Sequence, residues 1–184
     1  MAQYYYLIAS FPMISFESDP PYTIEEFQET SLQWLTGKDR KVFQDLISDE
    51  YSYGSDDVLD KWVSWDTALR NEISRIRSQK KGMDQESFVR TETGGWTLTD
   101  AVKEVFAQGN PYEAEEMEER IRWGFLSELE APFYFQFDRV LVYYLKLLLL
   151  IRKSKFTKER GGQRFDGTYR TMAEPFTQTR AGEQ

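Results

Sequence analysis

The most apolar stretch of the chain is "FDRVLVYYLKLLLLIRK", which runs from Phe137 to Lys153. A helix that crosses the hydrocarbon layer needs about 20 consecutive apolar residues, and this stretch is too short. Lys146 also stands in its middle, and a charge near the centre of a span costs about 2.5 to 3.5 kcal/mol. The pattern therefore predicts a soluble core helix that neighbouring elements cover on nearly all sides.

A second long helix is indicated by apolar residues that recur at spacings of four and three, which places them on one helical face. These residues are Val58, Trp62, Trp65, Leu69, Ile73 and Ile76. Lys80, Lys81 and Gly82 are expected to end this helix, because cations favour its negative end and glycine readily turns left-handed.

Start and stop signals divide the rest of the chain into further helices. Thr23 and Glu26 match a capping box, and Gly37 is expected to close the helix that they open. Further starts stand at Thr36 with Asp39, at Asp100 in "TLTD", and at Asn110 with Pro111. The last of these helices is expected to run to about Glu130.

The two ends of the chain depart from this pattern. "YYYLIAS", Tyr4 to Ser10, has the aromatic and β-branched content of a strand, but seven residues leave its type uncertain. From Gly161 onward the residues are polar and include glycines, so a flexible tail is expected over residues 161–184. We expect one helical domain over residues 1–160, an all-α, bundle-like fold of about six helices with long antiparallel helices and short connections.

The charge balance of the chain indicates which classes of partner it is not expected to bind. The chain has 31 acidic and 23 basic residues, and its net charge of -8 repels the phosphates of nucleic acids and anionic lipids. There is no cysteine, as expected in a reducing cytosol, and no basic segment of a signal peptide precedes the first apolar residues. We therefore expect a cytoplasmic protein that binds no nucleic acid and does not insert into the membrane.

The chain also contains no histidine, which removes the usual general base near neutral pH and the commonest metal ligand. Without cysteine, zinc sites are disfavoured as well. Neither GxxxxGK[ST] nor GxGxxG occurs, so the usual phosphate-binding loops are absent from the sequence. The composition predicts a protein that is not an enzyme and has no catalytic, cofactor-binding or metal-binding residues.

Two charged segments are candidate contact surfaces. Glu113, Glu116 and Glu119 in "YEAEEMEER" form the first candidate, although acids also favour the first turn of a helix and keep its outer face solvated. Arg70, Arg77 and Lys81, at spacings of seven and four, fall near one helical face and form the second candidate. This basic stripe is either a solvated face or a clamp for the carboxylates of a partner protein.

Four stretches carry a resemblance to a known family. They are "YYYLIASFPMI", "LRNEISRIRSQKKGM", "TGGWTL" and "FDRVLVYYLKLLLLIRK". In this order they resemble the C-type subunit of V-type (A/V-type) rotary ATPases, and the closest likeness is to the shorter C-subunit-like proteins encoded with bacterial V-type ATPases. The resemblance implies an all-α, non-catalytic coupling or assembly subunit of a proton- or sodium-transporting motor. Such a subunit binds the central stalk and the membrane rotor ring and is peripheral to the inner membrane through the complex.

A second class of function stays open beside this one. In this second class the chain is a free-standing helical regulatory or interaction protein, or a small enzyme that uses carboxylates. Genes for rotary ATPase subunits next to its own would favour the first class.

Overall fold

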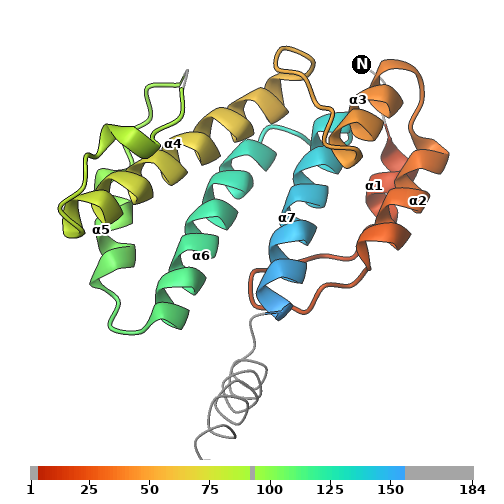
Figure 1. Cartoon of the computed structure of the whole chain (residues 1–184). Coiled ribbons are helices and arrows are strands. Elements are labelled where there is room, and N and C mark those ends of the chain that lie inside the picture. The colour runs from red at the N-terminus through yellow and green to blue at the C-terminus, as the bar shows by residue number, and fades with distance from the viewer. Residues whose placement is uncertain (1–3, 92–93, 156–184) are drawn as a thin grey trace, which may run out of the picture.

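The computed structural model describes residues 4–91 and 94–155, and within these ranges the chain is helical, with no strand (Figure 1). The seven α-helices and one 3₁₀ helix of the described residues are α1 (Tyr5–Ser10), α2 (Ile24–Trp34), α3 (Gly37–Ile47), α4 (Asp57–Lys80), η1 (Glu86–Phe88), α5 (Thr99–Ala107), α6 (Pro111–Glu130) and α7 (Phe137–Lys155). The expected all-α class is confirmed. The expected tail, residues 161–184, lies outside the described residues.

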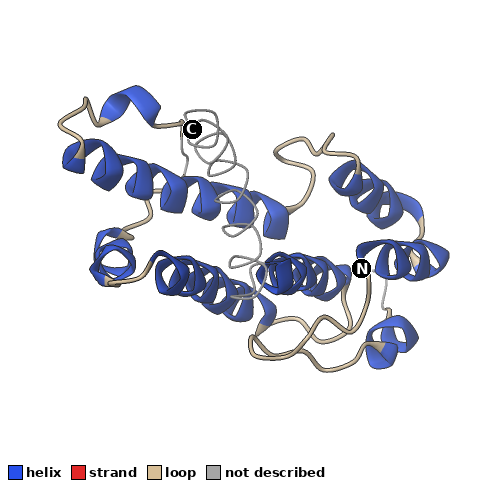
Figure 2. Ribbon diagram, turned by 60° about the horizontal axis from the view of Figure 1, so that its bottom comes forward, coloured by secondary structure: helices blue, strands red, loops and turns tan. Residues whose placement is uncertain are grey.

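The apolar helix α7 lies in the middle of the fold. It runs antiparallel to α6, and α2 and α4 also pack against it (Figure 1). Figure 2 views the α6–α7 pair close to end-on and shows α4 lying along one side of it. Val140, Leu141 and Leu147 of α7 are completely buried, as expected for a core helix.

Lys146 is the charge that interrupts this helix, and it is buried. Its Nζ pairs with the carboxylate of Glu130 and lies 5.0 Å from the ring centroid of Trp123. A buried charge with a close opposite partner is tolerated where an unpaired one is not. Among the described residues, no helix is both long and apolar enough to cross a membrane.

Two apolar clusters form the core. The larger joins α7 to the N-terminal helices α1, α2 and α3, and the smaller joins α4, α5 and α6. In the smaller cluster the rings of Trp65 and Phe125 stack with their centroids 4.2 Å apart. Trp62 packs against both clusters, so α4 connects the two halves of the fold.

Two of the expected helix starts are confirmed by side-chain hydrogen bonds, whereas the starts of α3 and α5 have no such bond. The backbone N–H of Glu26 donates to Thr23 Oγ1 at 3.2 Å, and the N–H of Thr23 donates to Glu26 Oε2 at 2.9 Å, which completes the capping box. Asn110 caps α6 by accepting a hydrogen bond from the N–H of Tyr112 at 3.0 Å. Gly82 follows the end of α4 with a φ of 66°, the left-handed region that glycine adopts without strain.

Gly37 differs from its expected role. Helix α2 ends earlier, at Trp34, because Leu35 and Thr36 are extended. Gly37 instead begins α3 with a φ of 56°. The glycine therefore belongs to the sharp turn between two helices rather than to the end of the first.

The segment of uncertain type at the N-terminus is the helix α1. Leu7 points into the core, and the N–H of Tyr4 donates to the carbonyl of Phe135 at 2.8 Å. A strand needs a neighbouring strand to pair its backbone groups, and the described part of the chain offers none. A helix satisfies those groups within the segment itself.

Candidate functional site

The acidic candidates do not share one exposed face of α6. Glu113 is exposed, whereas Glu119 is only 4% exposed. Glu116 is half-buried and pairs with Arg120, with 3.4 Å between Glu116 Oε1 and Arg120 Nη2. Successive residues of an α-helix are about 100° apart around its axis. Glu119 follows Glu113 by six residues and therefore lies about 120° around the helix from it. The expectation that Glu119 is part of an exposed acidic face is wrong.

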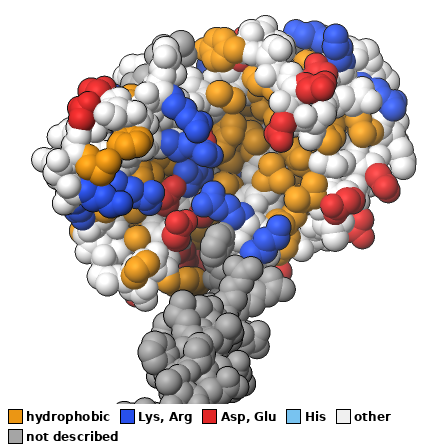
Figure 3. Space-filling model, in the orientation of Figure 1, with side chains coloured by type: hydrophobic (Ala, Val, Ile, Leu, Met, Phe, Trp, Pro, Cys, Tyr) orange, Lys and Arg blue, Asp and Glu red, His pale blue; other side chains and the backbone are white. Residues whose placement is uncertain are grey.

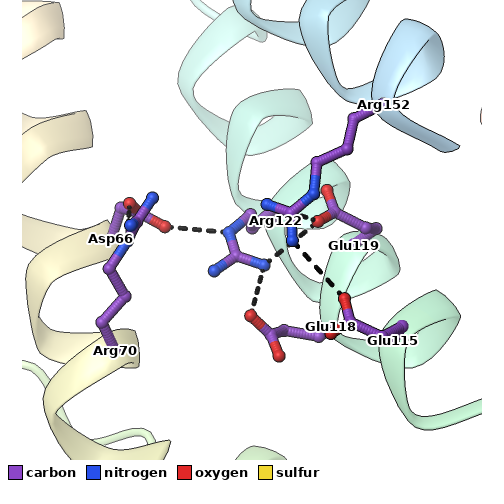
Figure 4. A network of polar contacts seen from close by, with 7 residues as sticks. All are labelled: Asp66, Arg70, Glu115, Glu118, Glu119, Arg122 and Arg152. Atoms are coloured by element: carbon purple, nitrogen blue, oxygen red, sulfur yellow. Dashed lines mark hydrogen bonds and ion pairs between the residues drawn. The ribbon is translucent and has the colours of Figure 1, made fainter. Parts of the chain in front are cut away.

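Glu119 belongs instead to a buried ion-pair network around Arg122 (Figure 4). The guanidinium of Arg122, only 3% exposed, lies 2.8 Å from Asp66 Oδ1 on α4. It also lies 2.7 Å from Glu118 Oε1 and 3.4 Å from Glu119 Oε1, both on its own helix. One arginine thus joins two helices through three carboxylates.

The network ends on both sides in an exposed arginine, Arg70 and Arg152, which Figure 4 shows flanking the buried residues. Arg70 Nε lies 2.6 Å from Asp66 Oδ2 on α4. On the other side Arg152 of α7 lies 3.2 Å from Glu119 Oε1 and 3.5 Å from Glu115 Oε2. Because α4, α6 and α7 each supply a member, the network holds three helices in a defined relation.

Burial and pairing oppose each other in this network. Burial alone would lower the pKa of Arg122, but Asp66 and Glu118 outweigh it, so the pKa is raised and the arginine stays charged. Burial raises the pKa of Glu119 above the ordinary value, although Arg122 and Arg152 act in the opposite direction. Its buried Oε2 accepts no hydrogen bond from the described part of the chain. Glu119 is therefore the least satisfied member of the network.

This leads to a prediction for the pH dependence of stability. A carboxyl with a raised pKa binds its proton more tightly in the folded chain, so its contribution to stability falls as pH rises from 4.5 through the raised pKa. Glu119→Gln does not ionise. The free energy of unfolding of Glu119→Gln minus that of the wild type, both measured in urea, should therefore increase as the pH rises from 4.5 through the raised pKa of Glu119. A Glu119→Gln difference that decreases with pH would contradict the prediction.

The basic candidates are exposed, and the structure brings two of them together. Arg70 and Arg77 line the same cavity beside α4. Lys81 is exposed too but caps the C-terminal end of α4 and is not part of that wall. The helical spacing thus correctly placed Arg70 and Arg77 on a common side.

A third surface was not anticipated from the sequence. Five aromatic side chains from α1, α2 and the α6–α7 connection are exposed and gather at one end of the fold; we call them the aromatic patch. They are Tyr5 (54% exposed), Tyr6 (75%), Trp34 (51%), Tyr134 (70%) and Phe135 (37%). Ring centroids are 4.5 Å apart for Tyr5 and Phe135 and 6.5 Å apart for Tyr6 and Trp34.

Neither the network nor the patch has a clear signal in one sequence. The spacing of Glu118 and Arg122 suits an ion pair within a helix, but Asp66 and Arg152 are distant in the chain. The aromatic patch likewise joins residues from three separate segments. Among the described residues, no group of three or more acidic side chains could hold a metal ion.

Comparison with known proteins places the chain in a family. No curated protein and no solved structure is significantly similar to it. One family model, described as "Protein of unknown function (DUF2764)", matches residues 1–55 and 48–174, which together cover most of the chain. The chain therefore belongs to the DUF2764 family.

Proposed function

We propose that the protein is a non-catalytic coupling or assembly subunit of a bacterial V-type rotary ATPase, where it links the central stalk and the membrane rotor ring. The observation that carries an interaction role is the aromatic patch. Single exposed apolar side chains are common, but a contiguous exposed group marks an interaction site, and Tyr and Trp are prominent among the residues that dominate protein–protein binding energy.

The identity of the complex is supported by the sequence resemblance. The four stretches that resemble the C-subunit-like proteins occur in the same order, and the resemblance as a whole covers most of residues 4–155. The helical fold agrees with the all-α class that the resemblance implies. The lack of histidine, cysteine and phosphate-binding loops in the sequence agrees with a protein that catalyses nothing itself.

The charged candidates fit this proposal as secondary contacts. A partner protein of the complex can reach exposed Glu113 and half-buried Glu116 on α6. It can also reach Arg70 and Arg77 on α4, and Lys81 at the C-terminal end of that helix. Charges at the rim of an interface mainly accelerate encounter and fix orientation rather than add affinity. The protein would then be cytoplasmic and peripheral to the inner membrane through the complex.

The test is capture of stalk and ring subunits by the purified chain, with a Tyr6→Ala/Trp34→Ala variant. Loss of one dominant aromatic side chain costs about 2 kcal/mol or more, so the dissociation constant should rise at least about 30-fold. The matched control, Tyr112→Ala/Met13→Ala, removes two exposed apolar side chains outside the patch and should bind normally.

Two outcomes would count against the proposal. If the unmodified chain captures none of the rotary ATPase subunits, the assignment to that complex is wrong. If capture occurs but the two variants weaken it equally, the aromatic patch is not the contact surface.

A further inference from the structure

A cavity of about 320 Å³ lies beside the ion-pair network, between α4, the segment that follows η1, α6 and α7. Five arginines line it: Arg70, Arg77, Arg90, Arg122 and Arg152. Figure 3 shows Lys and Arg side chains gathered on this face over α4 and the adjoining part of α6. The concentration is unusual because the chain as a whole has a net charge of -8.

The carboxylates nearby neutralise only part of this charge. Arg70, Arg122 and Arg152 share Asp66, Glu115, Glu118 and Glu119 through the ion pairs described above. Within residues 4–91 and 94–155, Arg77 and Arg90 form no ion pair. Five arginines against these four carboxylates leave the described wall of the cavity with one positive charge in excess. The guanidinium group of Arg77 lies 6.0 Å from the ring centroid of Phe106, a contact that leaves its N–H groups able to donate to an anion.

The backbone that carries Arg90 is held in place. Asn71, only 1% exposed, donates from Nδ2 to the carbonyl of Arg90 at 2.8 Å. In return the N–H of Arg90 donates to Asn71 Oδ1, also at 2.8 Å. This reciprocal pair fixes the segment after η1 against α4, and Arg122 is fixed by its own ion pairs. Arg122 and the backbone that carries Arg90 are thus organised before any ligand arrives, which reduces the entropy cost of binding.

We infer that this cavity binds a phosphate-bearing small molecule of the nucleotide class. The planar guanidinium group donates two parallel hydrogen bonds to phosphate oxygens, which makes arginine the preferred residue for such groups. The volume lies at the lower end of the range of about 300 to 1,000 Å³ for small-molecule sites.

Phe88 adds a surface for a flat ring. Its side chain is 55% exposed and forms part of the same wall, next to Arg90. Aromatic side chains stack on nucleobases, so the arginines would hold the phosphates while Phe88 supports the base. This site goes beyond the proposed role in the rotary ATPase and does not depend on it.

The experiment is calorimetric titration of the full chain with pyrophosphate, ADP and citrate at constant ionic strength. Binding of pyrophosphate and ADP is expected, with ADP the tighter of the two. In Arg77→Gln/Arg90→Gln the dissociation constants of both should rise at least about tenfold, because each hydrogen-bonded charge contributes strongly. The control Lys38→Gln/Lys41→Gln removes two exposed positive charges on α3, outside the cavity, and should bind as the wild type does.

Phe88→Ala separates the two parts of the site, since it should weaken ADP several-fold and leave pyrophosphate unchanged. The inference is overturned if neither pyrophosphate nor ADP binds, or if citrate binds more tightly than pyrophosphate. It is also overturned if Arg77→Gln/Arg90→Gln and Lys38→Gln/Lys41→Gln lose the same affinity for these ligands. An unchanged affinity of Phe88→Ala for ADP would overturn the nucleotide class. Unaltered melting temperatures of all variants would show that the losses come from the site.

Discussion

Replacing Leu147 with aspartate is expected to abolish cooperative folding. Leu147 is completely buried near the middle of α7, the helix around which the larger apolar cluster is built. An uncompensated buried charge costs about 3 to 5 kcal/mol, and the lost apolar burial adds to it, against a total stability of about 5 to 15 kcal/mol. Urea unfolding followed by circular dichroism and tryptophan fluorescence measures the loss.

A matched control uses the same change on the surface. Val63 of α4 is 42% exposed, so Val63→Asp should change the free energy of unfolding by about 0.5 kcal/mol or less. A cooperative transition in Leu147→Asp with the midpoint of the wild type would show that α7 is not the centre of the core.

Replacing Arg122 with methionine is expected to have the second largest effect. Methionine has no charge, so Glu118 loses the short ion pair it makes in the described structure, and Asp66 and Glu119 each lose one of theirs. Removal of one partner from a buried ion pair costs about 3 to 5 kcal/mol because the remaining charge is uncompensated. The midpoint of urea unfolding should fall accordingly.

Arg120 offers a control on the same helix. Its side chain is 50% exposed and pairs with Glu17 and Glu116 near the surface, so Arg120→Met should cost about 1 kcal/mol or less. Adding Glu118→Gln to Arg122→Met removes one uncompensated charge and should restore part of the stability. Equal losses in the two arginine variants would mean that the buried network contributes no more than surface pairs do.

Several elements could be predicted from the sequence because their signals are local. The capping box at Thr23, the glycine after α4, and the proline at the start of α6 each act through neighbours within one helical turn. The spacing of apolar residues along α4 shows which face of that helix is apolar, and this depends on no other segment. These signals were sufficient for the all-α class and for most helix ends.

Other features required knowledge of which segments meet. Glu119 was expected on an exposed face, but Arg122 from its own helix and Arg152 from α7 hold it in the interior. Gly37 carries a turn signal that suits either the end of one helix or the start of the next, and packing decided between them. The N-terminal segment was ambiguous because its length and composition allow both helix and strand.

The sequence by itself determined where the long helices lie, that the apolar stretch of α7 is interrupted by a charge, and that histidine and cysteine are missing. The tertiary structure decided the rest: the burial of the Arg122 network, the assembly of the aromatic patch, and the arginine-lined cavity. Each of these joins residues from segments distant in the chain. Helix periodicity and capping are set by neighbours in sequence, whereas burial and charge pairing depend on which surfaces the folded chain brings together.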